Sequence, residues 1–102
     1  MSVIVLNKDN FKNEVLECKE SVLVDFYADL CGPCHMMSPI LDELSEEEKN
    51  IKVCKIDTAE AMDLAKEYGV MTIPCIIAFK DGKEINRSIG LVNKDELLKL
   101  FD

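Results

Sequence analysis

The sequence contains no tryptophan, a single histidine and no apolar run that approaches the length of a membrane span. Its first residues, MSVIVLNKD, lack the basic lead, the long apolar region and the small-residue cleavage site of a secretory signal peptide. Internal repeats, low-complexity tracts and linker-like segments are also missing. These absences argue against a membrane or repeat protein, and we expect one cytoplasmic domain that covers residues 1–102.

Basic residues are scarce, because the chain has 12 lysines and arginines against 20 aspartates and glutamates, a formal net charge of −8. Such a surface repels phosphate backbones and anionic lipid, so we expect neither a nucleic-acid partner nor a membrane partner. The composition, 48% hydrophobic and 31% charged, is typical of a soluble globular protein rather than a disordered one. A chain of this length buries enough apolar surface to fold without metals or crosslinks.

The apolar pattern alternates between short strand-like runs and helical stripes. VLVDFYA, residues 22–28, is nearly continuous in apolar residues, which suits a strand covered on both faces. Asp81-Gly82 is a strong hairpin signal, and Asn93 is typical of a helix N-cap. The sequence predicts strands at 3–6, 22–28, 51–56, 75–80 and 84–89, and helices at 9–18, 34–49, 59–67 and 94–101. This order predicts an α/β fold in which helices cover both faces of a mixed sheet.

The five cysteines are an odd number, which argues against a fully paired disulfide framework. Cys31 and Cys34 form the one C-x-x-C motif of the sequence. A structural zinc site usually needs a second such cluster, and a permanent crosslink of so short a loop gains little entropy. In a reducing compartment a close pair is more often catalytic or metal-binding than structural. We therefore expect no metal and favour a redox-active pair, with Cys18 and Cys54 as packing residues.

The position of the pair gives one cysteine a chemical advantage. Cys31 lies in the loop after a predicted central strand, and Cys34 lies in the first turn of the next helix. Unpaired N–H groups and the helix dipole stabilise a thiolate there. Gly32 permits a tight turn, and Pro33 fits the start of a helix because it has no N–H to lose. Cys31 is the candidate nucleophile, and Cys34 can then attack a mixed disulfide on Cys31 and release the partner.

These residues resemble the thioredoxin family, and the similarity runs through nearly the whole chain. The shared residues are VDFYA at 24–28, CGPC at 31–34, Pro39, VCKID at 53–57, GV at 69–70, IP at 73–74, FKDG at 79–82 and Gly90. The resemblance implies a thioredoxin fold, with about five strands flanked by about four helices. It also implies a protein disulfide reductase that carries electrons on Cys31 and Cys34. Disulfide-containing protein substrates, a separate thioredoxin reductase that recharges the pair, no bound cofactor and a monomer follow from the same resemblance.

Asp25 interrupts an otherwise apolar strand, so burial should raise the pKa of its carboxyl group. The resemblance places Asp25 beneath the helix that carries the cysteines. It implies that Asp25 exchanges protons with Cys34 while the mixed disulfide is resolved. Lys55 matches a buried family lysine near that carboxyl, with a part in the same proton transfer. The alternative for both residues is a buried ion pair that serves packing alone.

Pro74 should not interrupt a buried strand, so it marks the start of a strand or a special bond. By resemblance its peptide bond is cis and it lies against the disulfide, while Ile73 offers backbone hydrogen bonds to an extended substrate. Gly90 corresponds to a third wall of this docking surface, where only a hydrogen fits. A β-bulge at Gly90 is the alternative.

Four residues depart from the family pattern. Leu30 stands beside Cys31 where most members have tryptophan, and it keeps an apolar knob for docking without the flat ring or its N–H. Tyr27 replaces a second tryptophan. His35 stands where lysine or arginine is usual, and it either tunes the thiolate or is a passive surface residue. Cys75 stands where threonine is common, and it is either a third sulfur near the pair or a buried inert thiol.

Two other functions stay open at this point. A glutaredoxin-like, glutathione-dependent oxidoreductase would share the Thr72-Ile73-Pro74 stretch. That family, however, usually has Pro-Tyr between its cysteines, and its paired-glycine anchor is missing near Gly90. The second alternative is a binding subunit of an assembly whose redox activity is incidental.

Overall fold

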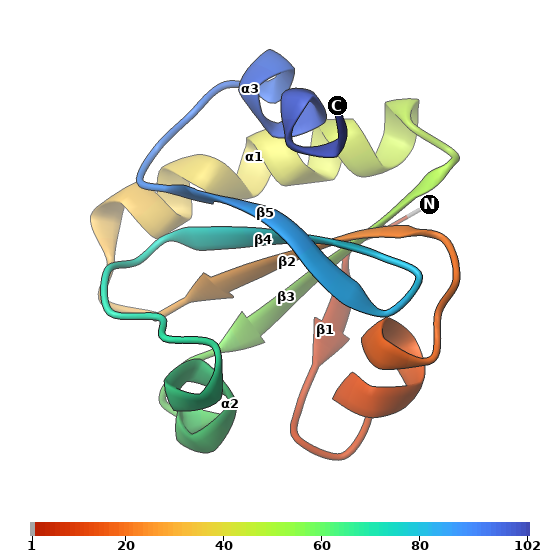
Figure 1. The fold of residues 1–102 in the computed structure, drawn as a ribbon. Helices are drawn as coiled ribbons and strands as arrows, with labels where there is room; N and C mark the ends of the chain where they lie inside the picture. Colours follow the sequence, from red (N-terminus) through yellow and green to blue (C-terminus); the bar gives the residue numbers. More distant parts are fainter. Residues whose placement is uncertain (1) are drawn as a thin grey trace.

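A five-stranded sheet forms the centre of the computed structural model, which describes residues 2–102 (Figure 1). The strands are β1 Ile4–Leu6, β2 Ser21–Tyr27, β3 Ile51–Asp57, β4 Cys75–Lys80 and β5 Lys83–Ile89. They lie in the order β1-β3-β2-β4-β5. The pairs β1–β3 and β3–β2 are parallel, whereas β2–β4 and β4–β5 are antiparallel. The predicted mixed sheet is confirmed, and β2, which leads into the CGPC motif, lies in its middle.

Helices cover both faces of the sheet, as the alternating pattern predicts. They are η1 Lys12–Leu16, α1 Gly32–Glu47, α2 Met62–Glu67, α3 Lys94–Leu98 and η2 Lys99–Phe101. α1 and α3 lie on one side of the sheet, and η1 and α2 lie on the other (Figure 1). None of the helices formed within residues 2–102 is long and apolar enough to cross a membrane.

Two predicted helices are shorter than their apolar stripes. The helix expected at 9–18 is a short π-helical element, because the Asn7 side chain accepts two backbone N–H hydrogen bonds and holds the preceding residues in a turn. The helix expected at 59–67 begins only at Met62. The carboxylate and the carbonyl oxygen of Asp57 accept the N–H groups of the intervening residues, so a turn forms before the helix can start.

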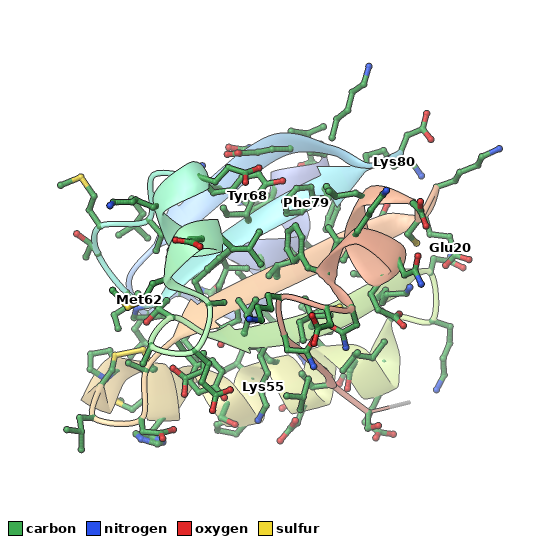
Figure 2. All side chains as sticks on the ribbon, turned by 90° about the horizontal axis from the view of Figure 1, so that it is seen from below. Glu20, Lys55, Met62, Tyr68, Phe79 and Lys80 are labelled. Atoms are coloured by element: carbon green, nitrogen blue, oxygen red, sulfur yellow. A yellow bond between two sulfur atoms is a disulfide. The ribbon has the colours of Figure 1, made fainter. Side chains whose placement is uncertain are left out.

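Alternate side chains of the strands fill two separate cores. In β2, Leu23 packs under α1 and α3, whereas Val24 packs on the opposite side under η1 and α2. Aromatic rings pack together in the second core: the ring centroids of Tyr68 and Phe79 (Figure 2) are 5.6 Å apart, and Phe11 lies 6.2 Å from Phe79. The burial of β2 on both faces agrees with its continuous apolar pattern. This burial holds the C-terminal end of β2 in place, and the loop that carries Cys31 starts there.

The β4–β5 hairpin and α3 follow local signals in the sequence. Asp81 and Gly82 both have positive φ, 54° and 77°, as a two-residue type I′ turn requires. Asn93 caps α3, because its side-chain oxygen accepts the Glu96 N–H at 2.9 Å. The hairpin and the cap are therefore confirmed.

Candidate functional site

Cys31 and Cys34 form a disulfide where β2 gives way to α1, with their Cα atoms 5.2 Å apart. The helix predicted from residue 34 begins at Gly32 instead, so Cys31 is its N-cap and Pro33 its second residue. The earlier start is compatible with proline, because the first four N–H groups of a helix have no partner within the helix. Both sulfurs therefore lie at the N-terminus of α1.

The sulfur of Cys31 is better placed to react than that of Cys34. The Cys34 N–H donates to Cys31 Sγ at 3.2 Å, and the positive end of the helix dipole points at the same atom. Both effects stabilise a Cys31 thiolate when the pair is reduced. Cys31 is half-buried, whereas Cys34 is only 4% exposed. An approaching disulfide therefore meets Cys31 first.

The loop before β4 lies against the disulfide. The peptide bond between Ile73 and Pro74 is cis, which confirms the prediction. The carbonyl oxygen of Ile73 lies 3.9 Å from Cys31 Sγ, and the Gly90 N–H donates to the Pro74 carbonyl oxygen at 2.8 Å. The fold thus gathers Cys31, Ile73, Pro74 and Gly90 from three loops that are far apart in the sequence.

The backbone of Gly90 gives a reason for glycine that the sequence did not suggest. Gly90 has a φ of 91°, a conformation that residues with a side chain rarely adopt. A Cβ atom there would meet no heavy atom of the protein within 4 Å, so the expected fit of only a hydrogen concerns a docked segment and stays a prediction. The bulge alternative is wrong, because the register shift of this hairpin lies between Ala78 and Phe79.

Each loop of the site carries an exposed apolar side chain. Leu30, just before Cys31, is fully exposed. Met71 is almost as exposed and lies in the loop before the cis proline, while Ile89, more than half exposed, ends β5. Met36, in the first turns of α1, is more than half exposed as well. Exposed apolar side chains on segments that border the disulfide are what a protein-binding surface needs.

The carboxyl group of Asp25 is buried on the α1 side of the sheet. It is 3% exposed, and its Oδ1 atom has no hydrogen-bond partner among residues 2–102. Burial raises the pKa of Asp25 to about 7, and the positive charge of Lys55 offsets only part of that rise. The predicted rise is therefore confirmed. Near neutral pH this carboxyl group is present in both its protonated and its ionised form.

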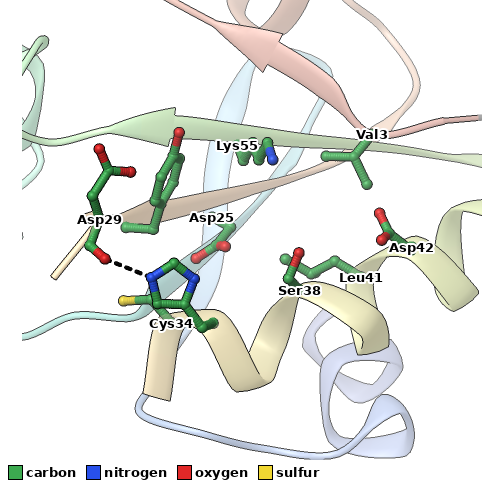
Figure 3. Close-up of a pocket in the computed structure, with 10 residues that line it drawn as sticks. Val3, Asp25, Asp29, Cys34, Ser38, Leu41, Asp42 and Lys55 are labelled. Atoms are coloured by element: carbon green, nitrogen blue, oxygen red, sulfur yellow. Dashed lines mark hydrogen bonds between the residues drawn. The ribbon is translucent and has the colours of Figure 1, made fainter. Parts of the chain in front are cut away.

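A pocket of about 160 Å³ extends from the surface to this carboxyl group. Its polar walls are formed by Asp25, Tyr27, Asp29, His35, Ser38, Asp42 and Lys55, and Cys34 contributes its sulfur-bearing side chain. Asp25 and Lys55 are register partners on the neighbouring strands β2 and β3, and both face the pocket (Figure 3). The pocket thus joins the buried carboxyl group to the less exposed cysteine of the pair.

Lys55 is not buried, contrary to the resemblance. Its side chain is partly exposed, and its Nζ atom lies over the Tyr27 ring, 5.7 Å from the ring centroid. A lysine on a partly exposed strand packs its aliphatic stem and keeps its ammonium group near water. Within residues 2–102 no ion pair or hydrogen bond joins Lys55 to Asp25, so the two charges interact only through space. The buried-ion-pair alternative is therefore wrong.

His35 links α1 to the loop that precedes the disulfide. Its Nε2–H donates to the carbonyl oxygen of Asp29, drawn as a dashed line in Figure 3. Its backbone N–H donates to the Cys31 carbonyl oxygen at 3.2 Å. His35 is therefore an exposed residue that is joined to the loop carrying Cys31, and any effect on the thiolate stays a prediction.

The other three cysteines pack in or against the core under η1 and α2. Burial raises the pKa of Cys54 to about 12 and also raises the pKa of the Cys75 thiol. Cys75 points to the face of the sheet opposite α1, which favours the inert thiol over a third reactive sulfur. The packing roles expected for Cys18 and Cys54 are confirmed.

Tyr27 is a site residue whose role the sequence did not suggest. Alternation along β2 places it on the same face as Asp25, and this signal could have drawn attention to it. Its contact with Lys55 depends on the pairing of β2 with β3, which the sequence does not reveal. In the part of the chain from residue 2 onward, no three His, Cys, Asp or Glu side chains gather as metal ligands.

Comparisons with known proteins agree with this geometry. The thioredoxin family model matches residues 2–102. The thioredoxin of Chlamydia trachomatis is 42% identical over 99 residues, which cover 97% of this chain and 95% of that protein. The thioredoxin of Rickettsia felis is 48% identical over 90 residues, 87% of this chain and 86% of that protein. A chloroplastic M-type thioredoxin of Triticum aestivum is 41% identical, over 98% of this chain and 58% of that protein.

The solved structure of a mutant thioredoxin from Halobacterium salinarum superposes with a TM-score of 0.89 at 35% identity, and the match covers 97% of this chain and 87% of that one. Proteins of this kind act on disulfides through a pair of cysteines and not through a bound cofactor. They work with a reductase and with substrates as partners. The chain belongs to the thioredoxin family and is a dithiol–disulfide oxidoreductase.

Proposed function

We propose that the protein reduces disulfide bonds of other proteins with Cys31 as the nucleophile and Cys34 as the resolving cysteine. The observation that carries this proposal is the position of Cys31 Sγ at the N-terminus of α1, where it accepts the Cys34 N–H. The Cys31 thiolate attacks one sulfur of a target disulfide, that S–S bond breaks, and the leaving sulfur takes up a proton. A mixed disulfide remains between Cys31 and the target. Gly32 and Pro33 hold the two cysteines at the spacing that this chemistry needs.

Asp25 and Lys55 serve the second step. The Cys34 thiol gives its proton to the Asp25 carboxylate, and the new thiolate attacks Cys31 Sγ. The mixed disulfide breaks, the Cys31–Cys34 bond forms, and the second target sulfur leaves with a proton. The target has then gained two electrons and two protons. A pKa near 7 supports this role for Asp25, because a proton acceptor works best near the ambient pH. Lys55 favours the ionised, proton-accepting form of the carboxyl group.

An extended target segment would dock beside the disulfide. Ile73 offers its backbone polar groups to the segment, Pro74 lies beside them, and Gly90 forms the neighbouring wall. Leu30 presents an apolar side chain next to the reactive sulfur. The full exposure of Leu30 and the 3.9 Å between Ile73 O and Cys31 Sγ support this arrangement. Backbone pairing of this kind suits many targets, because it does not depend on their side chains.

A separate thioredoxin reductase returns the two electrons by the reverse exchange at the same sulfurs. We place the cycle in the cytoplasm, where a reducing pool keeps the three remaining thiols unpaired. We also expect a monomer, because the end of the molecule that carries the disulfide has to be free for both partners.

The test uses the dithiol form and a disulfide-linked protein such as insulin. Cys31→Ser should abolish turnover and form no adduct. Cys34→Ser should lose turnover but accumulate a covalent adduct with the target, which is visible on a non-reducing gel and by mass spectrometry. Cys75→Ser, which removes a thiol from the opposite face of the sheet, is the matched control and should retain full turnover. A Cys34→Ser variant that traps nothing contradicts the assigned roles.

The same assay separates the proposal from a glutathione-dependent enzyme. Turnover should require a reductase of the thioredoxin type, and glutathione alone should support only slow recharging. Fast recharging by glutathione would favour the glutaredoxin-like alternative. A binding subunit would be indicated instead if the Cys31→Ser, Cys34→Ser double variant kept its biological function.

A further inference from the structure

The buried carboxyl group has a potential ion-pair partner that it does not contact. Asp25 and Lys55 are register partners on adjacent strands, and both line the same pocket. A lysine side chain is long and flexible enough to reach a carboxylate in this position. Even so, Asp25 Oδ1 has no hydrogen-bond partner in the described chain. The ammonium group of Lys55 is therefore held elsewhere.

The ammonium group of Lys55 lies over the aromatic ring of Tyr27. Tyr27 lies two residues after Asp25 in β2 and so presents its side chain to the same face of the sheet. Lys55 Nζ lies 5.7 Å from the centroid of its ring, within the range of a cation–π interaction. The ring and the carboxylate are thus alternative partners for one ammonium group. Pairing with the ring spares the ammonium group the desolvation that a contact with a buried carboxylate requires.

We propose that Tyr27 is a positioning residue for the resolving step: its ring keeps the Lys55 ammonium group out of hydrogen-bonding reach of Asp25, so that the carboxyl group stays free to take the proton of Cys34. This inference rests on the proposed role of Asp25. An ammonium group bound directly to the carboxylate would hold it in the ionised form and occupy an oxygen that has to accept the proton.

Several other titratable groups lie near the same carboxyl group. From α1 these are Cys34, His35 and Asp42, and from the cysteine loop Asp29, all of which line the pocket. Asp57, the register partner of Tyr27 on β3, adds a negative charge near the ring. Among these groups His35 is the one basic side chain, and the acidic ones cannot replace the Lys55 cation beside Asp25. The experiment is therefore run at several pH values and keeps all of these residues unchanged.

The experiment measures the pKa of Asp25 directly, by ¹³C NMR titration of its carboxyl carbon in the oxidised protein. Tyr27→Leu removes the ring and keeps an apolar side chain. It should release Lys55 to Asp25 and raise the ratio of ionised to protonated carboxyl at a given pH by about tenfold. Tyr27→Phe and Tyr27→Trp keep a ring and should leave the titration within about twofold of the parent protein.

A second set of variants, made in a Lys55→Met protein, distinguishes an effect of the lysine on the Asp25 titration from an effect of water entering the pocket. In a Lys55→Met protein no ammonium group is present, so Tyr27→Leu should leave the Asp25 titration unchanged. An equal change in both backgrounds would overturn the proposal, and so would a Tyr27→Phe titration that moves as far as that of Tyr27→Leu. The titration needs no substrate, so its result stands apart from the trapping test of the cysteine roles. In the parent background, Tyr27→Leu should also shift the pH profile of mixed-disulfide resolution to lower pH.

Discussion

At the scale of the residue, Asp25 ties the chemistry of the site to the stability of the protein. Its pKa is 3.8 in an open chain and about 7 in the fold, so the native state holds the proton more tightly. The protonated carboxyl group makes its full contribution to the free energy of unfolding below about pH 4, and this contribution is lost as the pH rises through 7. At 1.36 kcal/mol for each pKa unit, full ionisation costs the folded protein about 4 kcal/mol.

Replacing that carboxyl group should therefore stabilise the protein, most of all at alkaline pH. For Asp25→Asn we expect the free energy of unfolding to rise, with a gain at about pH 8.5 that exceeds the gain at about pH 5.5 by about 2 kcal/mol. Urea denaturation at the two pH values measures this difference. Asp42→Asn is the control, because Asp42 borders the same pocket but is exposed, so this variant removes a carboxyl group without removing a buried one. A gain for Asp25→Asn that is equal at both pH values would contradict the raised pKa.

Residue-level chemistry was the most predictable part of the site. The cysteine pair and the raised pKa of Asp25 each follow from a residue type in a local context, whereas the cis bond at Pro74 was predicted from the family resemblance. The contact between Lys55 and Tyr27 could not be predicted in this way, because it depends on how two strands distant in the sequence align. The same holds for the link between His35 and Asp29, which needs the course of the loop before α1.

At the scale of the element, the β4–β5 hairpin depends on a glycine for two independent reasons. Gly82 has a positive φ, and a Cβ atom there would lie 2.2 Å from the carbonyl oxygen of Leu16 at the end of η1. No side chain fits without moving the backbone of either element. The turn is therefore both a hairpin tip and the contact by which the hairpin packs against η1.

Alanine substitutions at two glycines should separate these two effects. Gly69→Ala places a side chain at a φ of 64° with no atom within 4 Å, so only backbone strain of about 1–2 kcal/mol is expected. Gly82→Ala adds the clash with Leu16, and we expect a loss above about 3 kcal/mol. Equilibrium urea denaturation of both variants gives the comparison. Equal losses would show that the backbone near Leu16 moves freely.

Strands were more predictable than helices in this chain. Residues 22–28 are nearly continuous in apolar residues because β2 is buried on both faces, and the predicted limits of β2 and of the strand at 51–56 agree with the structure to within a residue. The apolar residues at helical spacing in 9–18 and 59–67 indicate only which side chains pack against the core. Where those helices start is decided by Asn7 and Asp57, whose side chains compete for the same backbone N–H groups.

At the scale of the whole molecule, the net charge of −8 should influence which disulfides are reduced quickly. Like charges slow the encounter with anionic substrates, and salt screens this repulsion. Raising the ionic strength from about 10 mM to about 500 mM should speed the reduction of glutathione disulfide about two- to threefold and slow that of cystamine. The neutral hydroxyethyl disulfide is the control and should react at a constant rate. Identical salt profiles for the three compounds would show that the net charge does not act at the disulfide.

The separation of the sulfur atoms by the sheet has a consequence for capacity. Three cysteines, Cys18, Cys54 and Cys75, pack in or against the core under η1 and α2. The disulfide lies on the other side of the sheet, at the N-terminus of α1. Each molecule therefore carries two electrons at a time on one dithiol, and the three other cysteines do not increase this number. The rate at which the protein supplies electrons in a cell is therefore limited by its copy number and by how often each copy is reduced again.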